Sequence, residues 1–112
     1  MANWRLEPKP QVLAATSSGG AKIRFIRAFR SELDEPWLAL WRLEQGGKEM
    51  EFYVEENGGD PNTISSPTLV VFEFPKGVTS ELSNAAIDGV KFVIRTASEG
   101  RRSFDQAQIS QR

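Results

Sequence analysis

The sequence predicts an α+β fold, mainly an antiparallel β-sheet of about five strands with one short helix near residues 80–88. Three observations lead to this class: a hairpin pattern over 37–56, strand-like runs on both sides of it, and one capped helical segment. A β-sandwich or small barrel with an appended helix is the alternative fold. The 112 residues suit a single domain, 1–112, in which we expect 1–20 and 100–112 to be loosely packed ends.

The first strand-like run is residues 21–30, which follow a loop-like segment at 15–21. Its β-branched and aromatic residues favour a strand. As a strand it places Ile23, Phe25 and Phe29 on the core face, with Arg27 intruding among them. The alternative is a helix, in which Phe25 and Phe29 share a stripe that Lys22 interrupts.

The hairpin at 37–56 turns at Gly46–Gly47, because glycine adopts the positive φ angles of a type I′ turn. Counting outward from the turn sets one face of paired apolar residues, with Leu43 opposite Met50, Trp41 opposite Phe52, and Ala39 opposite Val54. The other face pairs Arg42 with Glu51 and Leu40 with Tyr53.

The C-terminal half predicts two further strands and the helix. Residues 68–74 are apolar on both faces, which indicates a central or doubly covered strand. In the helix, Thr79 or Ser80 is the N-cap, and Gly89 is placed to end it. Residues 91–96 are the last predicted strand. For the tail, the sequence leaves open a short helix from Ser103, an edge strand or a frayed end.

The residue inventory narrows the chemistry. The chain has no histidine and no cysteine, the usual ligands of zinc and copper and the usual bases and nucleophiles of catalytic triads. The acidic loop at 55–60 lacks the ligand spacing of a calcium-binding EF-hand, and the glycine pairs lack the spacing of phosphate-binding loops. We therefore expect no enzyme activity, no metal site and no cofactor.

Composition also bears on location and charge. The sequence has no apolar run of about 18 residues and no signal-peptide pattern at its N-terminus, so we expect a cytoplasmic protein with no membrane contact. The net charge of −1 divides unevenly, into +5 over residues 1–30, −7 over 31–60 and +1 over 61–112. This pattern predicts either a basic strand neutralised by an acidic hairpin or a dipolar surface that steers a charged partner.

The function expected from these features is non-catalytic binding of another protein, as an accessory, inhibitor or assembly subunit. The mixed face of the hairpin is the predicted contact surface, because an apolar centre rimmed by charge is typical of protein interfaces. Its predicted partner-binding residues are Leu38, Leu40, Tyr53, Arg42 and Glu51, with Glu55 beside them. The competing interpretation is that the helix or the C-terminal tail covers this face. The oligomeric state stays open.

Single-stranded nucleic-acid binding through 22–30 is the alternative function. Basic residues interleaved with aromatic residues suit a groove that binds phosphates and stacks nucleobases. The residues for this alternative are Lys22, Arg24, Arg27, Arg30 and, if the last strand lies nearby, Arg95. The weakly acidic net charge disfavours it, since nucleic-acid-binding domains usually carry a basic excess.

Overall fold

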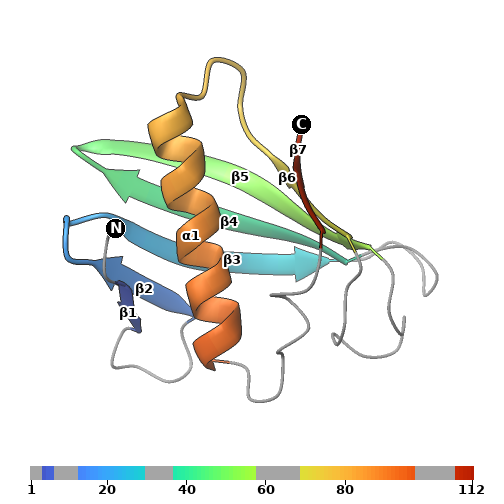
Figure 1. The fold of residues 1–112 in the computed structure, drawn as a ribbon, viewed down its shortest axis with the longest axis horizontal. Helices are drawn as coiled ribbons and strands as arrows, with labels where there is room; N and C mark the ends of the chain where they lie inside the picture. Colours follow the sequence, from blue (N-terminus) through green and yellow to red (C-terminus); the bar gives the residue numbers. More distant parts are fainter. Residues whose placement is uncertain (1–3, 7–12, 30–36, 58–68, 98–107) are drawn as a thin grey trace.

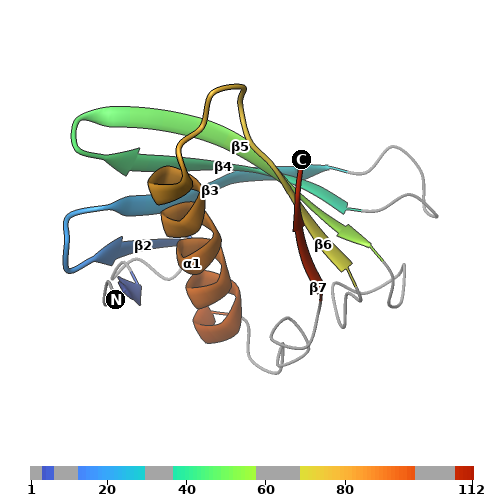
Figure 2. The same cartoon turned by 45° about the horizontal axis from the view of Figure 1, so that its top comes forward.

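One seven-stranded sheet with a helix across one face makes up the described part of the chain (Figures 1 and 2). The computed structural model describes residues 4–6, 13–29, 37–57, 69–97 and 108–112. In chain order the elements are β1 (Trp4–Leu6), β2 (Ala14–Ser17), β3 (Lys22–Phe29), β4 (Trp37–Gln45), β5 (Lys48–Asn57), β6 (Leu69–Glu73), α1 (Ser80–Ala97) and β7 (Gln108–Gln111). The α+β class is confirmed, and the sheet has seven described strands rather than about five.

The strands lie in the sheet in the order in which they follow one another in the chain, β1 to β7. Each neighbouring pair is antiparallel except β6 and β7, which are parallel. A parallel pair needs a crossover connection, and α1 lies within the one between β6 and β7.

The predicted hairpin is confirmed residue by residue. Gly46 and Gly47 have φ angles of 60° and 79°, as a type I′ turn requires. The register pairs Trp41 with Phe52 and Arg42 with Glu51. Trp41 and Phe52 are buried, at 2% and 1% exposure, so the apolar face of the hairpin is the core face.

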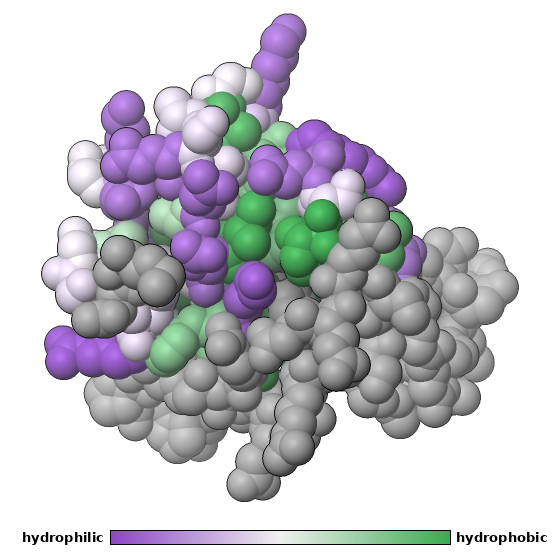
Figure 3. All heavy atoms as spheres, viewed as in Figure 1, coloured by the Kyte–Doolittle hydropathy of each residue, from purple (hydrophilic) through white to green (hydrophobic). Residues whose placement is uncertain are grey.

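The helix is longer than predicted, and the strand predicted at 91–96 is wrong because these residues continue α1. The apolar stripe of the helix runs on at helical spacing through Ala86, Val90, Val93 and Ile94, all of which are buried. Burial of this stripe against the sheet outweighs the β propensity of the valines and isoleucine. Figure 3 views this side of the molecule, with hydrophilic side chains outermost along the helix and apolar ones visible beside it.

Part of the segment predicted as a loop at 15–21 is strand β2, and the turn itself is only Ser18–Gly20. Ala14 and Ala15 are buried, so residues within the 1–20 end contribute to the core. Ser17 closes the turn: its backbone N–H donates to the Ala21 carbonyl at 2.7 Å, and its Oγ accepts the Ala21 N–H at 2.9 Å.

The end of the tail forms an edge strand, one of the three alternatives that the sequence leaves open. Strand β7 pairs in register with β6, and Ile109 packs against the core cluster. The predicted start of a tail helix at Ser103 lies outside the described residues. Strand β6 therefore has a neighbour on each side, and the burial of both Val70 and Val71 confirms its prediction as a central strand.

Candidate binding face

The sheet has one face packed under α1 and one face over which no described element lies. Alternation along β4 separates them: Trp41 and Leu43 are buried in the core, whereas Leu40 and Arg42 point to the opposite side. We call this second side the open face. Its residues on the three central strands are Lys22, Arg24, Arg27, Phe29, Leu38, Leu40, Arg42, Glu44, Glu49, Glu51, Tyr53 and Glu55.

A β-bulge decides which residues of β3 belong to the open face. The register with β4 shifts between Phe25, which pairs with Trp41, and Arg27, which pairs with Leu40. One extra residue in β3 reverses the alternation beyond that point. Arg27 and Phe29 therefore lie on the open face, although strict alternation predicts the core face for both.

The consequence for the aromatic residues of β3 is that they separate. Phe25 stays on the core side, in edge-to-face contact with Trp41 at 5.5 Å between ring centroids. The prediction that Phe29 faces the core is wrong: it is 42% exposed, and the Arg27 guanidinium lies 5.7 Å from its ring centroid. Arg27 was the signal for the bulge in the sequence, because an unpaired charge is costly to bury.

The centre of the open face is apolar. Leu40 lies between Arg27 and Tyr53 in one cross-strand row, and Leu38 pairs with Phe29 in the next. Both leucines are half-buried, while Tyr53 is 38% exposed. Two large aromatic side chains thus remain in contact with solvent at the edges of an aliphatic patch.

Charge is divided across the open face by strand. Bases occupy β3 and acids occupy β5, and β4 between them carries one of each, Arg42 and Glu44. Arg42 donates to Glu51 Oε2 at 3.0 Å, and this hydrogen bond together with the charge of Glu51 raises the pKa of the guanidinium above its usual value. At the far edge, Arg112 donates to Glu55 Oε2 at 3.2 Å. The β3 side is therefore basic and the β5 side acidic.

Arg24 stands out among the bases. It lies directly opposite Arg42, and like charges in this position repel. Arg42 is neutralised by Glu51, but the described residues include no ion-pair partner for Arg24. The face thus presents the Arg24 guanidinium to any carboxylate that a partner brings.

The structure gathers most of the predicted site residues on the open face. All five predicted partner-binding residues lie there, and so do Lys22, Arg24 and Arg27 of the nucleic-acid alternative. Arg30 is outside the described residues. Arg95 belongs to α1, which packs on the opposite side of the sheet, so its expected place on a neighbouring strand is wrong. The predicted helix cover is also absent, since α1 packs on the core face.

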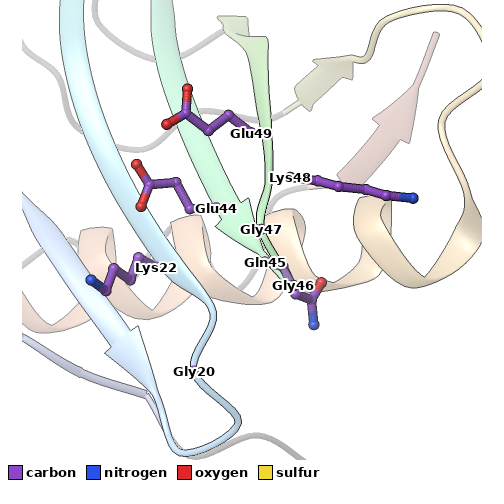
Figure 4. Close-up of a pocket in the computed structure, with 8 residues that line it drawn as sticks. All are labelled: Gly20, Lys22, Glu44, Gln45, Gly46, Gly47, Lys48 and Glu49. Carbon is purple, nitrogen blue, oxygen red and sulfur yellow. The ribbon is translucent and has the colours of Figure 1, made fainter.

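A shallow cavity of about 250 Å³ lies between the tips of the β2–β3 and β4–β5 turns (Figure 4). Lys22, Glu44 and Glu49 form one cross-strand row of the open face along its wall. Lys48 extends in a different direction from Glu49 in Figure 4. The cavity is therefore a continuation of the charged rim. No group of three acidic side chains in the described ranges is placed to hold a metal ion.

Within the described ranges, no helix is long and apolar enough to cross a membrane. No family model, curated protein or solved structure matches the chain. Its own residues are therefore the basis for functional inference.

Proposed function

We propose that this protein is a non-catalytic binding module that acts through protein–protein contact on its open face, as an accessory, inhibitor or assembly subunit. The observation that carries the proposal is the exposure of Phe29 and Tyr53 beside Leu38 and Leu40. Exposed apolar clusters with a polar rim are typical of interaction sites, and contact with a partner would remove this apolar area from water.

The make-up of the face supports a protein as its partner. Tyrosine and arginine are enriched at binding hot spots because they combine a large contact area with directional hydrogen bonds. Tyr53 and Arg27 flank Leu40 in a single cross-strand row, with Arg42 in the row beside it. The charged rim would set orientation and partner choice, while the apolar centre would supply most of the affinity.

The residue inventory supports a non-catalytic role. Without histidine or cysteine, catalysis would need a carboxylate or lysine tuned by its surroundings. The charged residues of the open face are exposed or half-buried on a sheet surface, where solvent screens their interactions.

Affinity capture from the native cell tests this proposal. The bait variants are Leu40→Glu, which puts a charge at the apolar centre, and Tyr53→Ala, which removes an exposed ring. We expect each to recover at least ten-fold less of the partner than the wild-type bait, because hot-spot truncations typically cost about 2 kcal/mol or more. Mass spectrometry quantifies the captured proteins.

Asn84→Glu is the matched control, because Asn84 is exposed on α1, on the other side of the sheet. It should capture the same partner as the wild type. Circular dichroism and urea unfolding verify that all baits are folded. Equal capture by a folded Leu40→Glu bait would remove the open face from consideration.

Single-stranded nucleic-acid binding is the second candidate, favoured by one observation. Lys22, Arg24 and Arg27 lie on the open face, and so do the exposed rings of Phe29 and Tyr53. Basic side chains that could bind phosphates and rings that could stack on nucleobases are therefore on the same side of the sheet. The acids of β5 on the same face oppose it. Titration with a labelled oligonucleotide at 50 and 200 mM salt (about a four-fold change) separates the two candidates. Tight binding that weakens steeply with salt would favour nucleic acid, and no detectable binding of the oligonucleotide at low salt would exclude it.

A further inference from the structure

The charges of the open face follow a simple order across β3, β4 and β5. The first cross-strand row is Lys22, Glu44, Glu49, and the next is Arg24, Arg42, Glu51. In both rows the β3 residue is basic and the β5 residue is acidic. The following two rows place Leu40 and Leu38 in the middle, on β4.

Such a face is complementary to itself under one particular symmetry. A two-fold axis that lies in the interface and runs along β4 turns the molecule over and exchanges the β3 and β5 sides. Each row then meets the same row of the second copy in reverse order. The basic strand of one copy faces the acidic strand of the other.

We propose that the partner bound by the open face is a second copy of this chain, related by a two-fold axis along β4. This inference rests on the proposed function, and it identifies the partner. The charge order selects the axis: a two-fold axis across the strands would set β3 against β3 and β5 against β5, and would place like charges together.

The arrangement satisfies the groups that the single chain leaves exposed. Arg24, which lies beside Arg42 without an ion-pair partner among the described residues, meets Glu51 of the second copy. In the neighbouring row Lys22 meets Glu49. Each of these contacts occurs twice, because the interface is isologous.

The two leucines at the centre of the face are covered by the same operation, and Phe29 lies opposite Glu55 of the second copy. Leu38 and Leu40 lie on the axis and meet their own counterparts. Arg27 meets the ring of Tyr53 from the second copy, a cation–π contact of the kind that Arg27 already makes with Phe29. Two sheets that pack in this way lie about 10 Å apart, which matches leucine side chains meeting from both sides.

Two residues on the axis are charged. Arg42 meets its counterpart, but each Arg42 is already bonded to Glu51 at 3.0 Å. Glu44 also meets its counterpart across the axis. Within its own sheet, Glu44 pairs with Lys22 of β3. Arg42 is therefore neutralised within its own chain, whereas Glu44 has Lys22 on one side and Glu49 on the other. The four base–acid contacts to either side of the axis decide the balance.

Sedimentation velocity on the purified full chain, with paired charge reversals, tests the proposal. Lys22→Glu/Arg24→Glu makes the charged rows acidic on both sides, and Glu49→Lys/Glu51→Lys makes the β3 and β5 sides both basic. We expect the wild type to dimerise, each variant alone to dimerise at least ten-fold more weakly, and an equimolar mixture of the two variants to regain the dimer. Raising the salt concentration should weaken the wild-type dimer.

The mixture is a control for misfolding, since an unfolded variant could not regain the dimer. Glu81→Lys/Asp88→Lys is matched in net charge to the second variant but alters exposed residues of α1. It should dimerise as the wild type does. Urea unfolding of each variant verifies that its sheet is intact.

Three results would overturn the inference: a monomeric wild type at 500 µM (a concentration at which about micromolar affinity gives a dimer), variants that dimerise unchanged, or a mixture that stays monomeric. The proposed function fails separately. If the wild type is monomeric and Leu40→Glu still abolishes capture of a different protein, only the second copy is excluded. If capture is also unchanged by Leu40→Glu, both proposals fall.

Discussion

Gly89 illustrates how a single residue can serve a role other than the one its local pattern indicates. Glycine near the end of an amphipathic segment is typical of a helix C-cap, yet here it lies inside α1. A Cβ at this position would lie 3.0 Å from Cη2 of Trp4 and 3.1 Å from Cβ of Ile23. The glycine therefore permits close contact between the helix and β1 and β3.

Gly89→Ala is expected to lower the free energy of unfolding by up to about 2 kcal/mol. Alanine gains about 1 kcal/mol of helix propensity over glycine. Overpacking of a close contact costs about 1–3 kcal/mol, and Ile23 Cβ, next to the backbone of a central strand, has little freedom to move away. Urea unfolding measures the change.

Asn84→Ala is the control for helix propensity, because Asn84 is exposed on the same helix. It should raise stability by a few tenths of a kcal/mol. A Gly89→Ala variant more stable than the wild type by about 1 kcal/mol, the full gain in helix propensity, would contradict the packing argument.

At the scale of elements, local chemistry determines where each helix or strand begins and turns. Helix α1 starts at Ser80, and the Leu82 N–H donates to Thr79 Oγ1 at 3.2 Å, as expected of an N-cap. The hairpin turns at the two glycines that its sequence indicates. Both features depend on a few neighbouring atoms rather than on the rest of the fold.

The cap predicts a matched pair of variants. Thr79→Ala should destabilise the protein by about 1 kcal/mol, because it leaves the Leu82 N–H without its partner. Thr79→Ser keeps a hydroxyl and should lose less than half as much. Thermal unfolding followed by circular dichroism compares the two, and equal losses would show that the hydroxyl does not act as a cap.

The turn at Gly46–Gly47 allows a second matched pair of variants. Gly47→Ala should cost about 1–2 kcal/mol, since an L-residue is strained at a φ of 79°. Gly46→Asn should change stability by less than about 0.5 kcal/mol, because Asn-Gly is favoured in type I′ turns. No heavy atom lies within 4 Å of a Cβ at either glycine, so the difference reports on the backbone alone. Urea midpoints that fall equally in both variants would argue against this turn geometry.

At the scale of the whole molecule, the chain ends cooperate with the sheet. Strand β7 returns after α1 and pairs with β6, so it forms the edge of the sheet opposite β1. Ile109 packs on the core, and the Arg112 N–H donates to the Phe72 carbonyl at 2.8 Å.

Deletion of residues 108–112 should therefore lower the free energy of unfolding by about 2–4 kcal/mol, through lost burial of Ile109 and lost strand hydrogen bonds. Arg112→Ala, which removes only the exposed ion pair with Glu55, should cost less than about 1 kcal/mol. Chemical unfolding of both variants measures this contrast. A deletion as mild as Arg112→Ala would mean that β7 adds little to the fold.

Sequence patterns predicted the hairpin register and most of the open face, because alternation across a tight turn is a local property. Trp41 faces Phe52, and Leu40 faces Tyr53, as the count from Gly46–Gly47 requires. The same patterns misplaced residues 91–96 and Phe29. The valines and isoleucine at 91–96 suit either element, and the bulge in β3 depends on pairing with β4.

The sequence by itself thus determined the turn, the start of the helix to within Thr79 or Ser80, the strand pairing of β4 with β5 and the lack of histidine and cysteine side chains. The tertiary structure alone decided that α1 continues through Gly89, that β7 joins β6, and that the bases of β3 share one face with the acids of β5. The physical reason is the separation along the chain of the groups that interact. Turns and caps depend on adjacent backbone groups, whereas helix length and bulge position depend on burial against segments distant in the chain.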